Sequence, residues 1–153
     1  MLYNNKSGLK FLLDDGGRTA AGFEGWTGDC VTRAVAIATG LPYRQVYDAI
    51  NELAKSERHG SRKRGISSAR DGVYKTTTRR FIESLGWKWV PTMFIGSGCK
   101  VHLKLGEIPS EPIIVSLSKH VCAVIDYTIH ATSDPSRDGT RCVYGYFIKR
   151  AQR

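Results

Sequence analysis

A cysteine, a histidine and an aspartate that lie far apart in the chain have the residue types of a nucleophilic triad: Cys30, His120 and Asp134. In such a triad the thiolate attacks an acyl carbon, the imidazole carries the proton to the leaving group, and the carboxylate holds the imidazole in one tautomer. If the fold brings the three side chains together, the sequence predicts cleavage or transfer at an amide bond through an acyl-thioester. This chemistry needs no cofactor and no metal.

A helix from Cys30 to Thr39 is expected to position the cysteine. Apolar residues recur at helical spacing after Cys30, Asp29 is a good N-cap, and Gly40 is the usual stop. The first turn of a helix carries unpaired N–H groups and the positive end of the helix dipole, and both favour a thiolate over a thiol. The alternative is that Cys30 is a small core residue, because free cysteine is among the most buried residue types.

A hairpin over residues 118–136 is expected to bring the histidine and the aspartate together. If its turn centres on Tyr127, residues whose numbers sum to 254 oppose each other, and His120 then faces Asp134. The alternatives are a core histidine with satisfied hydrogen bonds and an aspartate that forms the turn before Pro135.

The predicted face of His120 also carries Cys122 and Val124, which are small and apolar. Such a face suits packing against a helix. We expect that helix to be the one that begins at Cys30, which would align the thiol, the imidazole and the carboxylate.

The elements around these residues are helices first and strands second. Further helices are expected from Leu41-Pro42 to Ala54 and from Thr76 to Leu85. Strands are expected at Trp87–Pro91, Pro112–Leu117, Val121–Ile125, Tyr127–Thr132 and Cys142–Ile148. N-terminal helices packed on a C-terminal antiparallel sheet make an α+β fold, and the 153 residues are expected to form one domain. Residues 1–20 are expected to be a short strand or an irregular lead-in.

The stretch Gly28-Asp29-Cys30 at the start of an apolar helix, then His120 at the start of a strand and Asp134-Pro135 after the return strand, resembles the papain-like cysteine peptidase superfamily in its small bacterial and phage forms. The outline is similar to the peptidase domains that process bacteriocin leader peptides and, more distantly, to the CHAP amidohydrolases of cell-wall lysis. The resemblance covers about residues 20–148. It implies a papain-like fold and a peptidase, isopeptidase or amidase activity.

Papain-like enzymes usually place a glutamine a few residues before the cysteine, where it donates to the oxyanion. The residue six positions before Cys30 is Glu24, which can only accept when it is ionised. The resemblance therefore implies another donor, for which Trp26, Thr27 and the backbone N–H of Cys30 are candidates.

The chain is basic, since 23 Lys and Arg residues against 14 Asp and Glu residues give a net charge of +9. Residues 56–74 are predicted to be a mobile surface loop, with basic residues at Arg62, Lys63, Arg64 and Arg70. Such a loop is either a solvated segment or a binding surface for phosphates or another anionic partner. The charge favours an acidic peptide or protein substrate, an anionic cell wall or nucleic acid.

Two other functions compete with catalysis. A papain-like domain without activity would use the basic loop to bind nucleic acid or an acidic protein partner. A structural zinc site is also an alternative, because Cys99 and His102 have ligand spacing and His120 and Cys122 point to one face of a strand. The spacing between these two pairs matches no strong zinc pattern, so no metal is expected.

The cysteines and the apolar segments indicate the compartment. Four cysteines could form two disulfides, but the N-terminus shows no basic segment followed by an apolar stretch, so the thiols are expected to be reduced. The protein is then cytoplasmic, in the host cytoplasm if it is phage-encoded. No apolar run approaches the roughly 18–20 residues that span a bilayer, and no membrane partner is expected.

Overall fold

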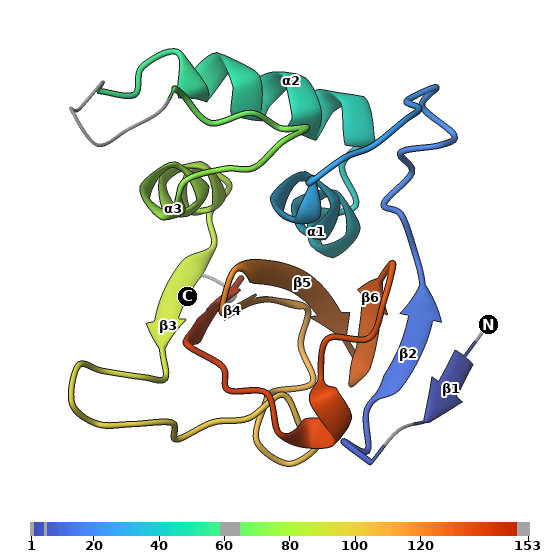
Figure 1. Cartoon of the computed structure of the whole chain (residues 1–153), viewed down its shortest axis with the longest axis vertical. Coiled ribbons are helices and arrows are strands. Elements are labelled where there is room, and N and C mark those ends of the chain that lie inside the picture. The colour runs from blue at the N-terminus through green and yellow to red at the C-terminus, as the bar shows by residue number, and fades with distance from the viewer. Residues whose placement is uncertain (1, 5, 59–64, 150–153) are drawn as a thin grey trace.

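The computed structural model describes residues 2–4, 6–58 and 65–149. Within these ranges, helices cover one face of a seven-stranded mixed sheet, and loops with a short 3₁₀ helix lie on the other side (Figure 1). The helices are α1 (Cys30–Thr39), α2 (Tyr43–Ala54) and α3 (Lys75–Ser84), and the 3₁₀ helix is η1 (Arg137–Gly139). The strands are β1 (Leu2–Asn4), β2 (Lys10–Leu13), β3 (Lys88–Pro91), β4 (Ile113–Leu117), β5 (His120–Ile125), β6 (Thr128–Ala131) and β7 (Gly145–Ile148). The predicted α+β class is confirmed.

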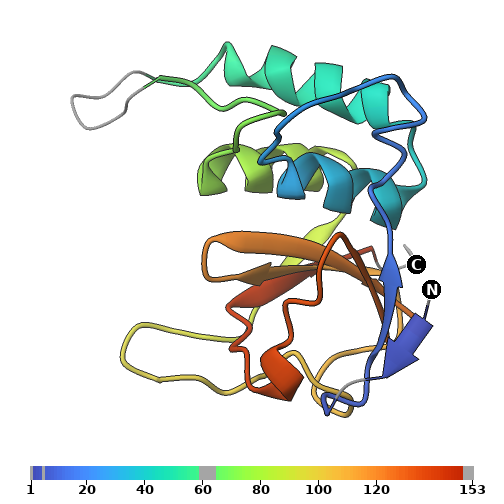
Figure 2. The same cartoon turned by 45° about the vertical axis from the view of Figure 1, so that its right-hand side comes forward.

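The helices form two layers above the sheet, with α1 and α3 between the sheet and α2 (Figures 1 and 2). Helix α1 ends as predicted at Gly40, whose φ of 75° suits glycine and whose N–H donates to the Ala36 carbonyl. Helix α2 packs on α1 through an apolar stripe that includes Val46 and Ile50, both fully buried. None of the helices in the described ranges is long and apolar enough to span a lipid bilayer.

The strand order in the sheet is β1-β2-β6-β5-β4-β7-β3. Strand β2 pairs with β6 in parallel, with Phe11 opposite Ile129, so the prediction of an antiparallel sheet is wrong for this pair of strands. The predicted lead-in contributes two strands rather than one short one. Leu9 and Phe11 explain this, because burying their side chains against the sheet removes apolar surface from water.

The hairpin of β5 and β6 has a different register from the predicted one. Asp126 and Tyr127 both have positive φ, 49° and 59°, as in the two-residue turns that favour tight hairpins. Ala123 therefore pairs with His130, and the opposed numbers sum to 253. A slip of one residue removes the predicted opposition of His120 and Asp134. The ladder also ends at Ala131, before it reaches the aspartate.

The two faces of β5 pack against different parts of the protein. Ala123 belongs to the core between the sheet and the helices, and Val121 packs against that core. Cys122 and Val124 belong to the core on the opposite face. The expectation that Cys122 and Val124 pack against the cysteine helix is therefore wrong, because α1 lies on the other face of the strand.

Part of the predicted mobile loop is a fixed segment, which we call the strap (residues 67–72). The Glu57 carboxylate is buried and accepts from the Ser67 N–H at 2.7 Å. Ala69 is fully buried, and its backbone N–H donates to Asn51 Oδ1 at 2.8 Å while its carbonyl accepts from the Thr32 hydroxyl at 2.8 Å. The prediction of a mobile loop is wrong for this segment, because these buried hydrogen bonds tie it to α1 and α2.

Candidate active site

Cys30 and His120 line the same cleft, which has a volume of about 800 Å³. Its walls come from the first turn of α1, the strap, the beginning of α3 and the strands β4 and β5. Both side chains are half-buried, and Trp26, which is 69% exposed, also lines the cleft. Two of the three predicted catalytic residues therefore share one cavity.

Asp29 is the N-cap residue of α1, as predicted, but its side chain makes no capping hydrogen bond. The carboxylate is instead buried and accepts from Arg33 Nη1 at 2.7 Å and from the Tyr43 hydroxyl at 2.6 Å. Burial, followed by the bond to Asp29, raises the pKa of Tyr43 well above its usual range. The carboxylate thus fixes the start of α1 and leaves the backbone N–H groups of the first turn uncapped beside Cys30.

The strap supports the segment that leads into Cys30. The Arg70 carbonyl accepts from the Gly28 N–H at 2.7 Å and from the Thr27 hydroxyl at 2.9 Å. In return, Arg70 Nε donates to the Trp26 carbonyl at 3.2 Å. Gly28 is required here, because a Cβ at that position would lie 2.9 Å from the Asp71 carbonyl oxygen.

These contacts change the assignment of the basic loop and of the oxyanion donors. Arg70 was one of the residues predicted to bind an anionic partner, but in the structure its side chain and its carbonyl hold the segment before Cys30. The other predicted basic residues, Arg62, Lys63 and Arg64, lie outside the described residues. The Thr27 hydroxyl already donates to Arg70. Glu24 is exposed and does not line the cleft, so its carboxylate is not at the oxyanion position.

His120 has an unusual environment for a neutral imidazole. Its Nε2 atom is buried and has no hydrogen-bond partner among the described residues. Burial, with the positive charges of Arg33 and Arg141, lowers the pKa of His120 from 6.5 to about 4. The ring is therefore uncharged at neutral pH and can accept a proton.

Arg141 makes a connection near the cleft that the sequence pattern does not reveal. Its guanidinium donates to the Ser118 carbonyl at 2.6 Å and to the Pro135 carbonyl at 3.5 Å. Ser118 lies two residues before His120, and Pro135 directly follows Asp134. Arg141 thus joins the two segments that carry the predicted triad partners, but an isolated arginine before a strand has no periodicity or motif that would identify it.

Asp134 does not line the cleft. Its Oδ1 atom accepts from the Ser136 N–H at 2.9 Å, a turn-forming bond. The pKa of Cys122 is raised to about 12, mainly by burial, with smaller contributions from the nearby Cys30 and Asp134. The charge of Asp134 is thus near β5, but the register that predicted its pairing with His120 is wrong. The role of Asp134 stays a prediction.

The other two cysteines are joined, because Cys99 and Cys142 form a disulfide with their Cα atoms 5.8 Å apart. The prediction that all four thiols are reduced is therefore wrong, and disulfides are rare in cytosolic proteins. In the described ranges, no group of three or more His, Cys, Asp or Glu side chains is placed to hold a metal. The alternative of a zinc site formed by Cys99, His102, His120 and Cys122 is therefore not supported among these residues.

Comparison of the sequence with family models and curated proteins, and of the fold with solved structures, finds no match. The resemblance to papain-like peptidases therefore depends on the residues themselves: the cysteine that begins α1, the histidine that begins β5, and the order of helices and strands. The cleft that these two residues share is the site to which a function can be assigned.

Proposed function

We propose that the protein is a papain-like cysteine hydrolase or acyl transferase that acts on an amide bond, with Cys30 as the nucleophile and His120 as the general acid and base. The observation that supports this most is that the two side chains line one cleft, where the buried Nε2 atom of His120 has no partner among the described residues. A buried polar atom without a hydrogen bond costs about 1–3 kcal/mol, a cost that catalytic groups often carry.

The chemistry uses a neutral imidazole. His120 takes the proton of the Cys30 thiol as the sulfur attacks the carbonyl carbon, and the uncapped N–H groups at the start of α1 donate to the oxyanion. The C–N bond then breaks, and the imidazolium gives its proton to the departing nitrogen. Water, or another acceptor in a transferase, attacks the thioester and restores the thiol. Trp26 remains a candidate donor to the oxyanion.

The charges around the cleft support an acidic substrate. Three exposed cationic side chains line it, from Lys75, Arg79 and Lys119, of which Arg79 is paired with the Glu83 carboxylate. The exposed acidic residue in its lining is Asp71. A carboxylate-rich peptide would be attracted to this lining. Lys75 also lies over the ring of Tyr144, 5.4 Å from its centroid, which orders its ammonium at the cleft.

The pH dependence of Cys30 alkylation by iodoacetamide tests the pairing of thiol and imidazole. In the wild type we expect peptide mapping to find fast modification at Cys30 at neutral pH, and almost none at the fully buried Cys122. His120→Ala should slow the reaction at Cys30 at neutral pH by about 10²-fold, because the thiol then lacks its base. His130→Gln is the matched control, because His130 is half-buried and contacts Asp14 outside the cleft.

A library of acidic peptides then tests hydrolysis, with Cys30→Ala as the inactive control. Equal alkylation rates in wild type and His120→Ala would contradict the proposal. In that case retained binding of an anionic partner by Cys30→Ala would support the rival, non-catalytic function.

Asp134→Asn tests the third predicted residue separately. The asparagine side-chain oxygen can still accept from the Ser136 N–H, so the turn is preserved while the charge is removed. Slower alkylation of Cys30 in this variant would support Asp134 as the residue that orients His120. An unchanged rate would restrict Asp134 to the turn.

A further inference from the structure

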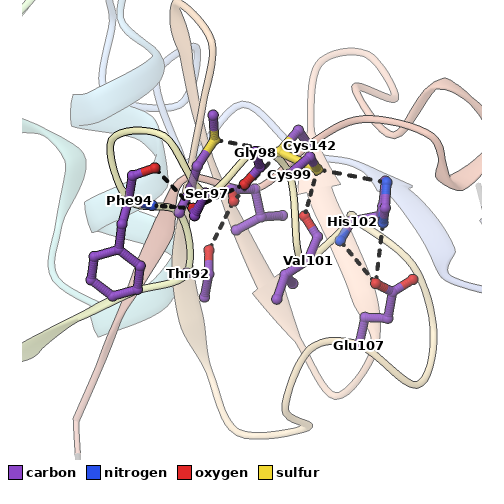
Figure 3. The surroundings of a disulfide bond; sticks show 11 residues. Thr92, Phe94, Ser97, Gly98, Cys99, Val101, His102, Glu107 and Cys142 are labelled. Atoms are coloured by element: carbon purple, nitrogen blue, oxygen red, sulfur yellow. Dashed lines mark hydrogen bonds and ion pairs between the residues drawn. A yellow bond between two sulfur atoms is a disulfide. The ribbon is translucent and has the colours of Figure 1, made fainter.

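A second group of reactive side chains surrounds the disulfide between Cys99 and Cys142 (Figure 3). Cys99 is in the loop after β3, and Cys142 lies three residues before β7. Neither cysteine lines the cleft that contains Cys30. The chemistry of this group is therefore independent of the function proposed above.

His102 lies between this disulfide and a carboxylate. Its Nε2 atom is 3.6 Å from Cys99 Sγ, and its Nδ1 atom is 3.2 Å from Glu107 Oε1. The same carboxylate oxygen accepts the backbone N–H of His102 at 3.2 Å. Figure 3 shows the ring held between Glu107 on one side and the sulfur atoms on the other.

The carboxylate determines which ring nitrogen can accept a proton. The hydrogen bond from His102 lowers the pKa of Glu107, so this carboxylate is ionised at neutral pH and accepts from Nδ1–H. In the neutral ring, the lone pair is then on Nε2, the atom that faces Cys99. When the disulfide is reduced, His102 is therefore placed to take the proton of the Cys99 thiol.

The two sulfur atoms differ in accessibility. The Cys99 residue is exposed, whereas Cys142 is half-buried and its Sγ lies 3.7 Å from the thioether of Met93. An external sulfur atom consequently meets Cys99 first. A pair with one exposed, base-assisted thiol and one sheltered thiol has the division of roles that thiol–disulfide exchange requires.

We propose that Cys99, Cys142 and His102 form a thiol–disulfide exchange site that acts on disulfides of small molecules or exposed peptides. In the reduced protein, Cys99 gives its proton to His102 and its thiolate attacks one sulfur of the substrate, which breaks the substrate S–S bond. The departing thiolate takes the proton from His102. Cys142 then loses its proton to the medium and attacks Cys99 Sγ, which forms the internal disulfide and releases the second thiolate. Two electrons pass from the protein dithiol to the substrate disulfide.

Oxidised glutathione is the probe that tests the order of these steps. The fully reduced chain, in a Cys30→Ala background that removes the other accessible thiol, should lose two hydrogens by intact mass and gain the internal disulfide. In a Cys142→Ser variant a stable mixed disulfide with glutathione should accumulate on Cys99. In a Cys99→Ser variant the reaction of Cys142 should be slower than that of Cys99 by at least about tenfold.

His102→Gln tests the base. Its rate of mixed-disulfide formation on Cys99, in the Cys142→Ser background, should fall by about 10²-fold at pH 7 and approach the unsubstituted rate above about pH 9, where a thiol ionises unaided. A purely structural defect would not be rescued by pH. Glu107→Gln should give a smaller loss in the same direction, and His130→Gln should give none. Because His102 and Glu107 are partly exposed, with side chains 37% and 31% accessible, folding of these variants is expected to be retained.

The opposite pattern would overturn the proposal. Preferential addition of glutathione to Cys142 would show that Cys142, and not the His102-assisted Cys99, attacks the substrate. An unchanged rate in His102→Gln at pH 7 would reduce the cluster to a structural disulfide with a histidine beside it.

Discussion

Arg33 Nη1 lies 2.7 Å from Asp29 Oδ1, and the Asp29 side chain is fully buried while that of Arg33 is 11% exposed. The second carboxylate oxygen of Asp29 accepts from Tyr43 at the start of α2. This ion pair joins the residue before Cys30 to the first turn of α1 and to the next helix. It also brings the Arg33 guanidinium close enough to lower the pKa of His120.

Removing the carboxylate should strongly destabilise the protein. Asp29→Ala leaves the Arg33 charge buried without a partner, for which we expect the free energy of unfolding to fall by about 3–5 kcal/mol in urea denaturation. The control is Glu52→Gln, which removes the exposed Lys55–Glu52 pair and should cost less than about 1 kcal/mol. Similar losses in the two variants would contradict a special role for the buried pair.

The depressed pKa of His120 predicts that stability depends on pH. Between pH about 4 and 6.5 the unfolded chain binds a proton at His120 that the folded protein does not, so the free energy of unfolding rises with pH across this window. The stabilisation is complete above pH 6.5 and is lost as the pH falls toward 4. For this half-buried side chain we expect a change of about 1–3 kcal/mol.

Urea denaturation at several pH values measures this effect. His120→Gln should flatten the dependence in the same window, while His130→Gln should retain it. A wild-type stability that does not change between pH 4 and 6.5 would show that folding does not lower the pKa of His120, and would contradict the burial of an unpartnered imidazole.

The helices and most strands could be predicted from the sequence because their signals are local. Apolar spacing and Gly40 locate α1, and runs of β-branched residues locate β4 to β7. The cysteine and the histidine of the cleft followed from the same local positions, one at a helix start and one at a strand start.

The rest depends on contacts that local patterns do not encode. The register of β5 and β6 depends on whether Asp126 and Tyr127 both adopt the left-handed conformation, and a difference of one residue changed which residue faces His120. The fixed strap was missed because its composition is that of a loop, while Glu57 and Asn51, which anchor it, belong to other segments. The role of Arg141 depends on two carbonyls more than five residues away in the sequence.

The contact of Gly28 with the strap predicts a loss of both stability and reactivity. In Gly28→Ala the new Cβ would lie 2.9 Å from the Asp71 carbonyl oxygen, so the strap or the cysteine segment must shift. We expect a destabilisation of about 1–3 kcal/mol, and slower alkylation of Cys30 because its helix start moves relative to His120. Glu24→Gln, a change at an exposed residue outside the cleft, should alter neither property. Retention of wild-type alkylation by Gly28→Ala would mean that the strap does not position the nucleophile.

The disulfide should stabilise the fold mainly by restricting the unfolded chain. It closes a loop between residues that are 43 positions apart, and a loop of this length corresponds to about 4 kcal/mol of lost chain entropy in the unfolded state. We therefore expect Cys99→Ser with Cys142→Ser to lower the free energy of unfolding by about 3–4 kcal/mol under oxidising conditions. Dithiothreitol should lower the wild-type stability to that of the double variant and leave the double variant unchanged. A wild type that is equally stable with and without the reductant, with its reduction verified by mass, would show that the covalent link adds nothing to the backbone pairing of His102 with Cys142 and the contact of Cys142 with Met93.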